Sequence, residues 1–107
     1  MSITSDLIRG HTDTIILAHL MQKDSYGYEI NKQIKIKTNK QYELKEATLY
    51  SAFRRLENGG FITSYWGSGE SGARRRYYTI TSAGKELFKK NKQDWLSAKD
   101  IINQLIE

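Results

Sequence analysis

The sequence predicts a mostly α-helical domain with one small β-hairpin. Apolar residues recur at helical spacing along most of the 107 residues. Two short segments, 61–66 and 75–80, are instead rich in aromatic and β-branched residues and enclose a glycine-rich stretch, which is typical of two strands and a turn. Three helices, a hairpin and a long final helix, in that order, predict a winged helix-turn-helix with a C-terminal extension in one structural domain.

The first predicted helix spans residues 5–21, with Ser5 as its N-cap and Asp6 in its first turn. One apolar stripe contains Leu7, Leu17 and Met21, and Ile8, Ile15, Ile16 and Leu20 lie beside it. A helix that is apolar over so wide an arc is expected to have two packing partners. One partner is the core of its own domain, and the other is a candidate second subunit.

The next two helices are predicted over 26–37 and 46–58. Asp24 or Ser25 is expected to cap the first of them, and Gly59-Gly60 ends the second. In the helix over 46–58, the residues at spacings i, i+3, i+4 and i+7 are expected to be buried, namely Leu49, Ala52, Phe53 and Leu56.

The opposite face of the helix over 46–58 carries small, hydroxyl-bearing and cationic side chains. Its outward stripe contains Ala47, Ser51, Arg54 and Asn58, flanked by Thr48, Tyr50 and Arg55. These groups suit close approach to a DNA major groove, with hydrogen bonds to phosphates and base edges. Tyr50 has an alternative role, in which it packs onto a neighbouring helix. Lys45, directly before the helix, is included in the predicted DNA-binding set.

The stretch Gly67–Gly72 fits the G-x-G-x-x-G pattern of a loop that holds a dinucleotide pyrophosphate. Such a loop lies between a strand and a helix, because the helix N-terminus supplies the amides that bind the phosphates. Here the residues after it, Arg75–Ile80, favour a strand, and the chain has no second βαβ unit. The sequence therefore predicts a flexible hairpin tip and no nucleotide cofactor.

Three consecutive arginines follow that tip. Strand alternation is expected to place Arg74 and Arg76 on one face of the hairpin and Arg75 on the other. A wing of this kind can straddle a DNA backbone, where its arginines neutralise phosphates or enter a minor groove. We expect one of the three arginines, but not all of them, to pair with a nearby acid.

The positive charge is concentrated in one part of the chain. The net charge is +5, and residues 74–92 hold seven arginines and lysines against Glu86 alone. A basic cluster of this kind is typical of nucleic-acid binding, while a plain solvated basic surface is the alternative. Charge alone does not decide between the two.

The last predicted helix runs from its N-cap Thr81 toward Leu105. An alternation of three- and four-residue spacings, typical of a helix-pair seam, is formed by Phe88, Asn91, Trp95, Ala98, Ile102 and Leu105. The pattern is shorter than a coiled coil requires. It predicts a dimeric helix pair or bundle with helix 5–21, and core packing within one subunit is the alternative. Residues 1–80 would then be the DNA-binding region and 81–107 the dimerisation helix.

Several classes of protein find no support in the sequence. The chain has no cysteine, so disulfides and thiolate metal sites are excluded. His11 and His19 have no third ligand at metal-site spacing, and no catalytic constellation stands out. The longest apolar stretch, 15–21, is interrupted by His19 and too short to span a bilayer. We therefore expect a cytoplasmic protein that is not an enzyme and needs no cofactor.

Three segments resemble the PadR family of winged-helix transcriptional regulators. They are SYGYEI at 25–30, EATLYSAFRRLENGGFI at 46–62 and GARRRYYTITSAGKEL at 72–87. The resemblance covers nearly the whole chain. EATLY, SYWG and the single tryptophan of the last helix are similar to the compact multidrug-resistance regulators of that family.

The resemblance implies a homodimer that reads a palindromic operator as a repressor and is released by a small aromatic compound or drug. The DNA contacts that it implies are Tyr26, Tyr28, Thr48, Tyr50, Ser51, Arg54, Arg74, Arg75 and Arg76. Tyr26 and Tyr28 depend mainly on the resemblance, and one of them is expected to lie in the core. Ser51 stands where many members have a proline, which should shift contacts without abolishing the helix.

The resemblance also implies a ligand site at the dimer centre, where paired tryptophans sandwich flat aromatic drugs. Trp95 would supply the ring, and the residues of the first helix expected to face the same space are Leu7, Gly10, Asp13, Thr14 and Leu17. Asp13 would attract a cationic ligand, whereas Lys99, one turn after Trp95, would oppose it. The alternative is that Trp95 is ordinary dimer core without a ligand.

Three other functions stay open at this point. A winged helix can serve as a protein-interaction module, although such a module does not need a triple-arginine wing. The chain can be a small-molecule sensor whose DNA role is secondary. A regulator can also bind DNA and respond to no small molecule.

Overall fold

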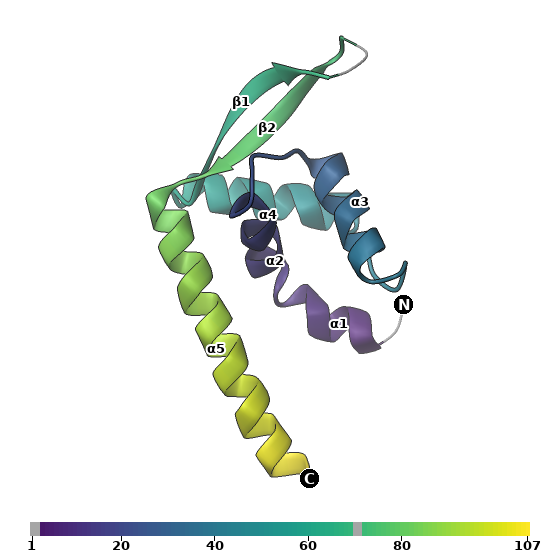
Figure 1. Cartoon of the computed structure of the whole chain (residues 1–107), viewed down its shortest axis with the longest axis vertical. Coiled ribbons are helices and arrows are strands. Elements are labelled where there is room, and N and C mark those ends of the chain that lie inside the picture. Colours follow the sequence, from purple (N-terminus) through teal and green to yellow (C-terminus); the bar gives the residue numbers. More distant parts are fainter. Residues whose placement is uncertain (1–2, 70–71) are drawn as a thin grey trace.

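The computed structural model describes residues 3–69 and 72–107. Its elements, in order, are α1 (Ile3–Arg9), α2 (Thr12–Leu20), α3 (Gly27–Lys37), α4 (Glu46–Asn58), β1 (Ile62–Ser68), β2 (Arg74–Ile80) and α5 (Ser82–Ile106). The hairpin rises from one end of the helices, and α5 extends away from it in the opposite direction (Figure 1). The predicted fold class, a winged helix-turn-helix with a long C-terminal helix, is confirmed.

The core lies between α2, α3, α4 and the base of the hairpin. The buried apolar side chains are Ile16, Leu17, Leu20, Ile30, Ile34, Tyr42, Leu44, Leu49, Ala52, Phe53, Leu56, Ile62 and Tyr78. Burial of each leucine, isoleucine or phenylalanine side chain among them stabilises the fold by roughly 1.5–3 kcal/mol before the cost of ordering it. Phe53 stacks on Tyr78 with the ring centroids 4.0 Å apart, which joins α4 to β2.

Two helices replace the single helix predicted over 5–21, so that prediction is wrong. Gly10, which is among the weakest helix formers, lies at the break. The hydroxyl of Thr12, a buried residue, donates a 2.7 Å hydrogen bond to the carbonyl of Arg9. This bond stabilises the break. Ser5, the predicted N-cap, lies inside α1, because that helix begins at Ile3.

The bounds predicted for the helix over 46–58 are confirmed, whereas the cap predicted for the helix before it is wrong. Tyr26 is the N-cap of α3, in an extended conformation. Ser25 instead forms an antiparallel bridge with Tyr78, in which each backbone N–H donates to the other residue's carbonyl, at 3.2 and 2.8 Å. This bridge fastens the segment before α3 to the hairpin.

The two predicted strands are confirmed as an antiparallel pair, with Ile62 opposite Ile80 at the base and Ser68 opposite Arg74 near the tip. Gly72 has a φ of +82°, a left-handed conformation that favours glycine. Glu70 and Ser71, which belong to the predicted hairpin tip, lie outside the described residues.

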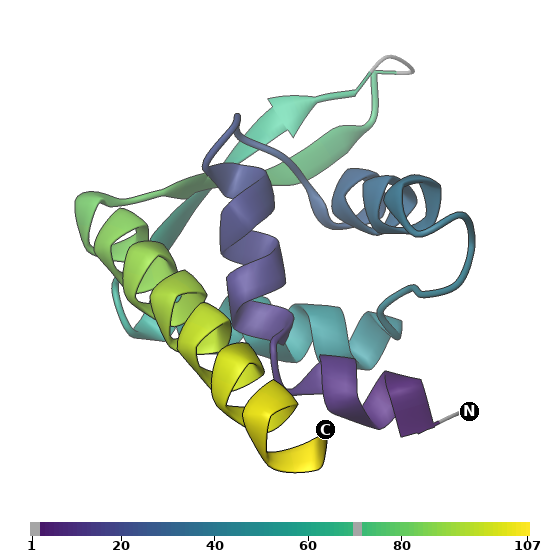
Figure 2. The ribbon, with the colours of Figure 1, turned by 60° about the horizontal axis from the view of Figure 1, so that its bottom comes forward.

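The prediction that Thr81 caps the last helix is also confirmed. Its side-chain oxygen accepts a 3.1 Å hydrogen bond from the N–H of Gly84 and donates one of 2.7 Å to the carbonyl of Gly60. The helix packs against α2 in its first half (Figure 2). From residue 92 onward, every residue of α5 is exposed in the single chain.

No helix among the described residues combines the length and the apolar character needed to cross a membrane.

Candidate nucleic-acid interface

The outward face of α4 is the first part of the candidate interface. The four residues predicted to be buried there are buried, and the outward stripe of Ala47, Ser51, Arg54 and Asn58 is exposed. Thr48 is partly buried, and Lys45 is exposed at the N-cap position. The helix therefore presents hydroxyls, a small methyl and a guanidinium to solvent over its first three turns.

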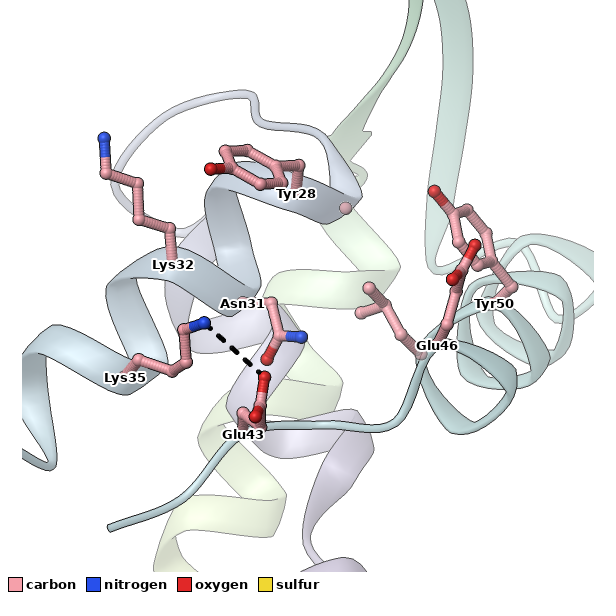
Figure 3. A pocket seen from close by; sticks show the side chains of 9 residues that line it. Tyr28, Asn31, Lys32, Lys35, Glu43, Glu46 and Tyr50 are labelled. Atoms are coloured by element: carbon pink, nitrogen blue, oxygen red, sulfur yellow. Dashed lines mark ion pairs between the residues drawn. The ribbon is translucent and has the colours of Figure 1, made fainter. Parts of the chain in front are cut away.

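A hollow of about 320 Å³ lies between α3 and the start of α4. Figure 3 shows Tyr28 and Lys32 on its α3 side, with Glu46 and Tyr50 on its α4 side. In the lining of this hollow, the side-chain amide of Asn31 donates a hydrogen bond to the backbone carbonyl of Leu44 and accepts one from the backbone N–H of Leu44, both 2.8 Å long. This pair of hydrogen bonds fixes the connection between α3 and α4, and so the angle at which α4 is presented.

Tyr50 combines the two roles that the sequence left open. The residue is 44% exposed, yet its ring also packs edge-to-face on Phe53 with a centroid distance of 5.7 Å. A Cβ atom added to Gly27 would lie 3.0 Å from the Tyr50 hydroxyl, so only a glycine at the start of α3 admits Tyr50 here without displacement.

Neither of the tyrosines near α3 lies in the buried core, so the expectation that one of them would is wrong. Tyr28 is 73% exposed. Tyr26 is partly buried, and the guanidinium of Arg75 lies over its ring, 4.5 Å from the centroid.

The three wing arginines alternate as predicted, and each lies over an aromatic ring. Arg74 lies 4.8 Å from the Trp66 centroid and Arg76 lies 5.9 Å from that of Tyr78. Arg74 and Arg76 are exposed, and Arg75 is partly buried on the other face. The expectation that one arginine pairs with an acid is confirmed, because Arg76 lies 3.2 Å from Glu57.

A second hollow, of about 500 Å³, brings these parts together between α3, α4 and the hairpin. Its lining contains Tyr26, Gly27, Tyr28, Tyr50, Trp66, Arg74, Arg75, Arg76 and Tyr78. Six of the predicted DNA-binding residues therefore share one concave surface. Thr48 and Ser51 line a neighbouring hollow instead, beside Arg9 and Arg55. Arg9 belongs to α1 but lines this hollow beside the start of α4, a long-range proximity that no pattern within one element predicts.

Asp13 is not available to attract a cationic ligand, which corrects the expectation for it. Its carboxylate accepts two hydrogen bonds from the guanidinium of Arg55, one of them 3.2 Å long from Nε. The hydrogen bond to Asp13 raises the pKa of Arg55 above its ordinary value. The pair joins α2 to α4 across 42 residues of sequence, a separation at which no local pattern predicts pairing.

The residues predicted around Trp95 are only partly brought together. Trp95 is 43% exposed, and its ring packs edge-to-face on His11, with a centroid distance of 5.0 Å. Leu17 is fully buried in the core, so its predicted place beside the tryptophan is wrong. The reason is that α2 buries Leu17 in the core together with Ile16 and Leu20.

The remaining members of that set lie nearer to solvent. Leu7, Gly10 and Lys99 are exposed, and Thr14 is partly buried. His11 was not selected from the sequence, because its position beside Trp95 depends on the break.

The predicted seam on α5 divides into two parts. Phe88 and Asn91 are partly buried against the chain's own helices, and Phe88 packs on the core. The other four residues, Trp95, Ala98, Ile102 and Leu105, are exposed. Leu105 is 77% exposed, far more than an apolar side chain in a core would be. This half of the helix therefore presents an apolar stripe that residues 3–69 and 72–107 leave exposed.

A helix presented beside an aromatic and basic wing on a small helical core defines the chain as a winged helix-turn-helix protein of the transcription-regulator class. More particularly, it belongs to the transcriptional regulator PadR-like family, which matches residues 16–90. PadR regulators are DNA-binding proteins and not enzymes, so the prediction that this chain is not an enzyme is confirmed.

Individual relatives agree with this assignment. A transcriptional regulator from Clostridium thermocellum is 51% identical, with a TM-score of 0.87 over 96% of this chain and 100% of its own. A PadR family transcription regulator from Clostridium difficile R20291 is 38% identical, with a TM-score of 0.77 over 91% of this chain and 99% of its own. An uncharacterized protein of Lysinibacillus sphaericus is 45% identical over 105 residues, 98% of this chain and 96% of its own.

Proposed function

We propose that the protein is a homodimeric repressor that binds a palindromic operator and is released by a planar aromatic compound. The observation that carries the DNA-binding part is the hollow of about 500 Å³ in which α3, α4 and the wing present tyrosines and arginines together. Arginines and tyrosines are common phosphate contacts, and one concave surface can follow one stretch of duplex.

In this proposal, α4 reads the bases. Ser51 and Arg54 lie on its exposed stripe, with Thr48 beside them, and an arginine that donates two hydrogen bonds to guanine is the commonest specific contact in a major groove. Lys45, Tyr28 and Tyr50 bind phosphates at the edge of the groove. Arg74 and Arg76 contact the backbone beyond it, because both are exposed on the same face of the wing.

The uncovered apolar stripe of α5 supports the dimer. Trp95, Ile102 and Leu105 are 43%, 49% and 77% exposed in the single chain, and an apolar stripe of this kind is typical of a protein interface. A second copy of α5, with α1 at its side, would cover it. Residues 1–80 would then form the DNA-binding region and 81–107 the dimerisation helix. Twofold symmetry would place two α4 helices on two half-sites of a palindrome.

The ligand part of the proposal rests on Trp95. Two copies of its partly exposed ring, brought together by the dimer, would hold a flat aromatic molecule between them. Asp13 is paired with Arg55 and adds no free negative charge, while Lys99 is exposed one turn beyond the tryptophan. We therefore propose that neutral or anionic planar compounds bind better than cationic ones.

A gel shift of the purified protein on its own upstream DNA, with and without planar aromatic compounds of each charge, tests this proposal. We expect a specific protein–DNA complex, and we expect neutral or anionic compounds to dissociate it. Specific binding that no compound affects would leave Trp95 as dimer core and remove the ligand part. Binding equal to that of random DNA would reject operator recognition.

A further inference from the structure

We infer that Arg75 is a positioning residue, which holds the wing against the start of α3 and acts on DNA through the wing's order instead of through a phosphate of its own. The inference rests on the proposed DNA-binding function. It assigns a role to a five-residue cluster, here called the wing clamp, that contains Asp24, Tyr26, Tyr65, Arg75 and Tyr77.

The contacts of the wing clamp join the hairpin to the segment before α3. The hydroxyl of Tyr65 donates a 2.7 Å hydrogen bond to the carboxylate of Asp24, and this bond raises the pKa of Tyr65 above its ordinary value. Tyr77 stacks on Tyr65 at 5.6 Å and meets Tyr26 edge-to-face at 5.3 Å. The guanidinium of Arg75 also lies over the Tyr26 ring, 4.5 Å from its centroid.

Arg75 is the member of the wing clamp nearest to the hairpin tip. Its guanidinium lies over the backbone at Gly69, where an added Cβ would be 2.7 Å from Cζ. A similar approach occurs two residues along the strand, where a Cβ on Gly67 would be 2.7 Å from the Tyr77 ring. The glycines that resembled a nucleotide-binding loop therefore let two clamp side chains cross the strand closely.

The other two wing arginines differ from Arg75 in what they join. Arg74 and Trp66 both lie within the hairpin, and their contact leaves Arg74 exposed. Arg76 reaches Glu57 at the end of α4 and is exposed as well. Arg75 alone among the three stacks on a residue of the α3 segment, and it is the one that is partly buried.

A wing held in place before DNA arrives has a thermodynamic consequence. Ordering a mobile segment on binding costs free energy, so a pre-ordered wing binds more tightly with the same phosphate contacts. Loss of a phosphate contact instead lowers the dependence of log Kd on log salt by about 0.9. The two roles of an arginine are therefore separable by measurement.

The test combines amide order in the free protein with operator binding over a range of salt. Heteronuclear NOE values at Gly69, Gly72 and Ala73 are expected to fall in Arg75→Ala and in Tyr26→Leu, and to stay high in Tyr26→Phe, which keeps the ring. Because an exposed cation–π contact is worth about 0.5–1 kcal/mol and a desolvated one about 2, affinity for operator and for random DNA should each fall about two- to thirtyfold in Arg75→Ala.

The salt slope should not change in Arg75→Ala, and the double variant Arg75→Ala with Tyr26→Leu should be weakened by less than the product of the single effects. Gly69→Ala, which displaces the guanidinium but keeps every charge, should weaken binding at an unchanged slope. Arg74→Ala is the matched control, with a slope lowered by about 0.9 and the NOE at Gly69 retained.

The inference is overturned if Arg75→Ala lowers the slope by about 0.9 while the wing amides keep their NOE values. Arg75 would then be a direct phosphate contact. The NOE measurements use the free protein. They therefore test whether the wing clamp orders the hairpin tip even if the wild-type protein does not bind an operator.

Discussion

His19 is a partly buried histidine at the end of α2, and its environment disfavours its charged form. Burial lowers its pKa from the ordinary value, and the positive charges of Lys37 and Lys23 lower it further, whereas Glu29 acts in the opposite direction. The unfolded chain therefore takes up a proton near pH 6.5 while folded His19 is still neutral. The histidine costs nothing above that pH and makes folding less favourable below it.

We accordingly expect the free energy of unfolding to fall between pH 7.5 and pH 5.5 in the wild type, and to fall less in His19→Gln. Urea denaturation at one fixed protein concentration measures both profiles, since the stability of the proposed dimer would depend on concentration. Parallel profiles for the two proteins would show that His19 does not carry this part of the pH dependence.

At the scale of the elements, two glycines with different surroundings test how α5 and α1 are fixed. A Cβ on Gly84 would lie 2.1 Å from the carbonyl oxygen of Phe61, so α5 crosses the start of the hairpin too closely for any side chain there. Gly84→Ala should lower the free energy of unfolding by about 1–3 kcal/mol, the range for overpacking, or more. Gly10→Ala, with nothing within 4 Å of its Cβ, is the control and should change it by less than about 1 kcal/mol. Equal effects would contradict this packing.

The elements also show which parts of the fold the sequence predicts. Local signals predict α4 correctly from end to end, because its buried stripe and its terminal glycines agree. They predict a continuous first helix, because the apolar residues keep their spacing across Gly10. A hydrogen bond from the hydroxyl of Thr12 to the carbonyl of Arg9 stabilises the break, and the apolar pattern does not predict that bond.

The candidate site divides in the same way. The outward stripe of α4 and the alternation of the arginines follow from periodicity within one element. The stack of Arg75 on Tyr26 and the pair of Asp13 with Arg55 join residues far apart in sequence, and no local pattern predicts them. Tertiary contacts of this kind decide which charged residues remain open to a ligand or to DNA.

For the whole molecule, the proposed dimer gives the next prediction. Ile102, 49% exposed on the α5 stripe, would be buried between two copies. Ile102→Lys would bury unpaired charges there, so we expect a monomer in sedimentation velocity and operator affinity at least about tenfold lower. Gln93→Lys places the same charge outside the stripe and should stay dimeric. A dimeric Ile102→Lys protein would show that the stripe is not the interface.

In the proposed complex, α4 reads bases while the wing binds the DNA backbone. An anisotropy titration of wild type and Arg54→Ala on operator and random duplexes, over a range of salt, tests this assignment most directly. Wild type should prefer the operator, and Arg54→Ala should lose about 1–3 kcal/mol of that preference, as a base contact does, with a smaller loss on random DNA. Equal losses of Arg54→Ala on both duplexes would contradict base reading by α4.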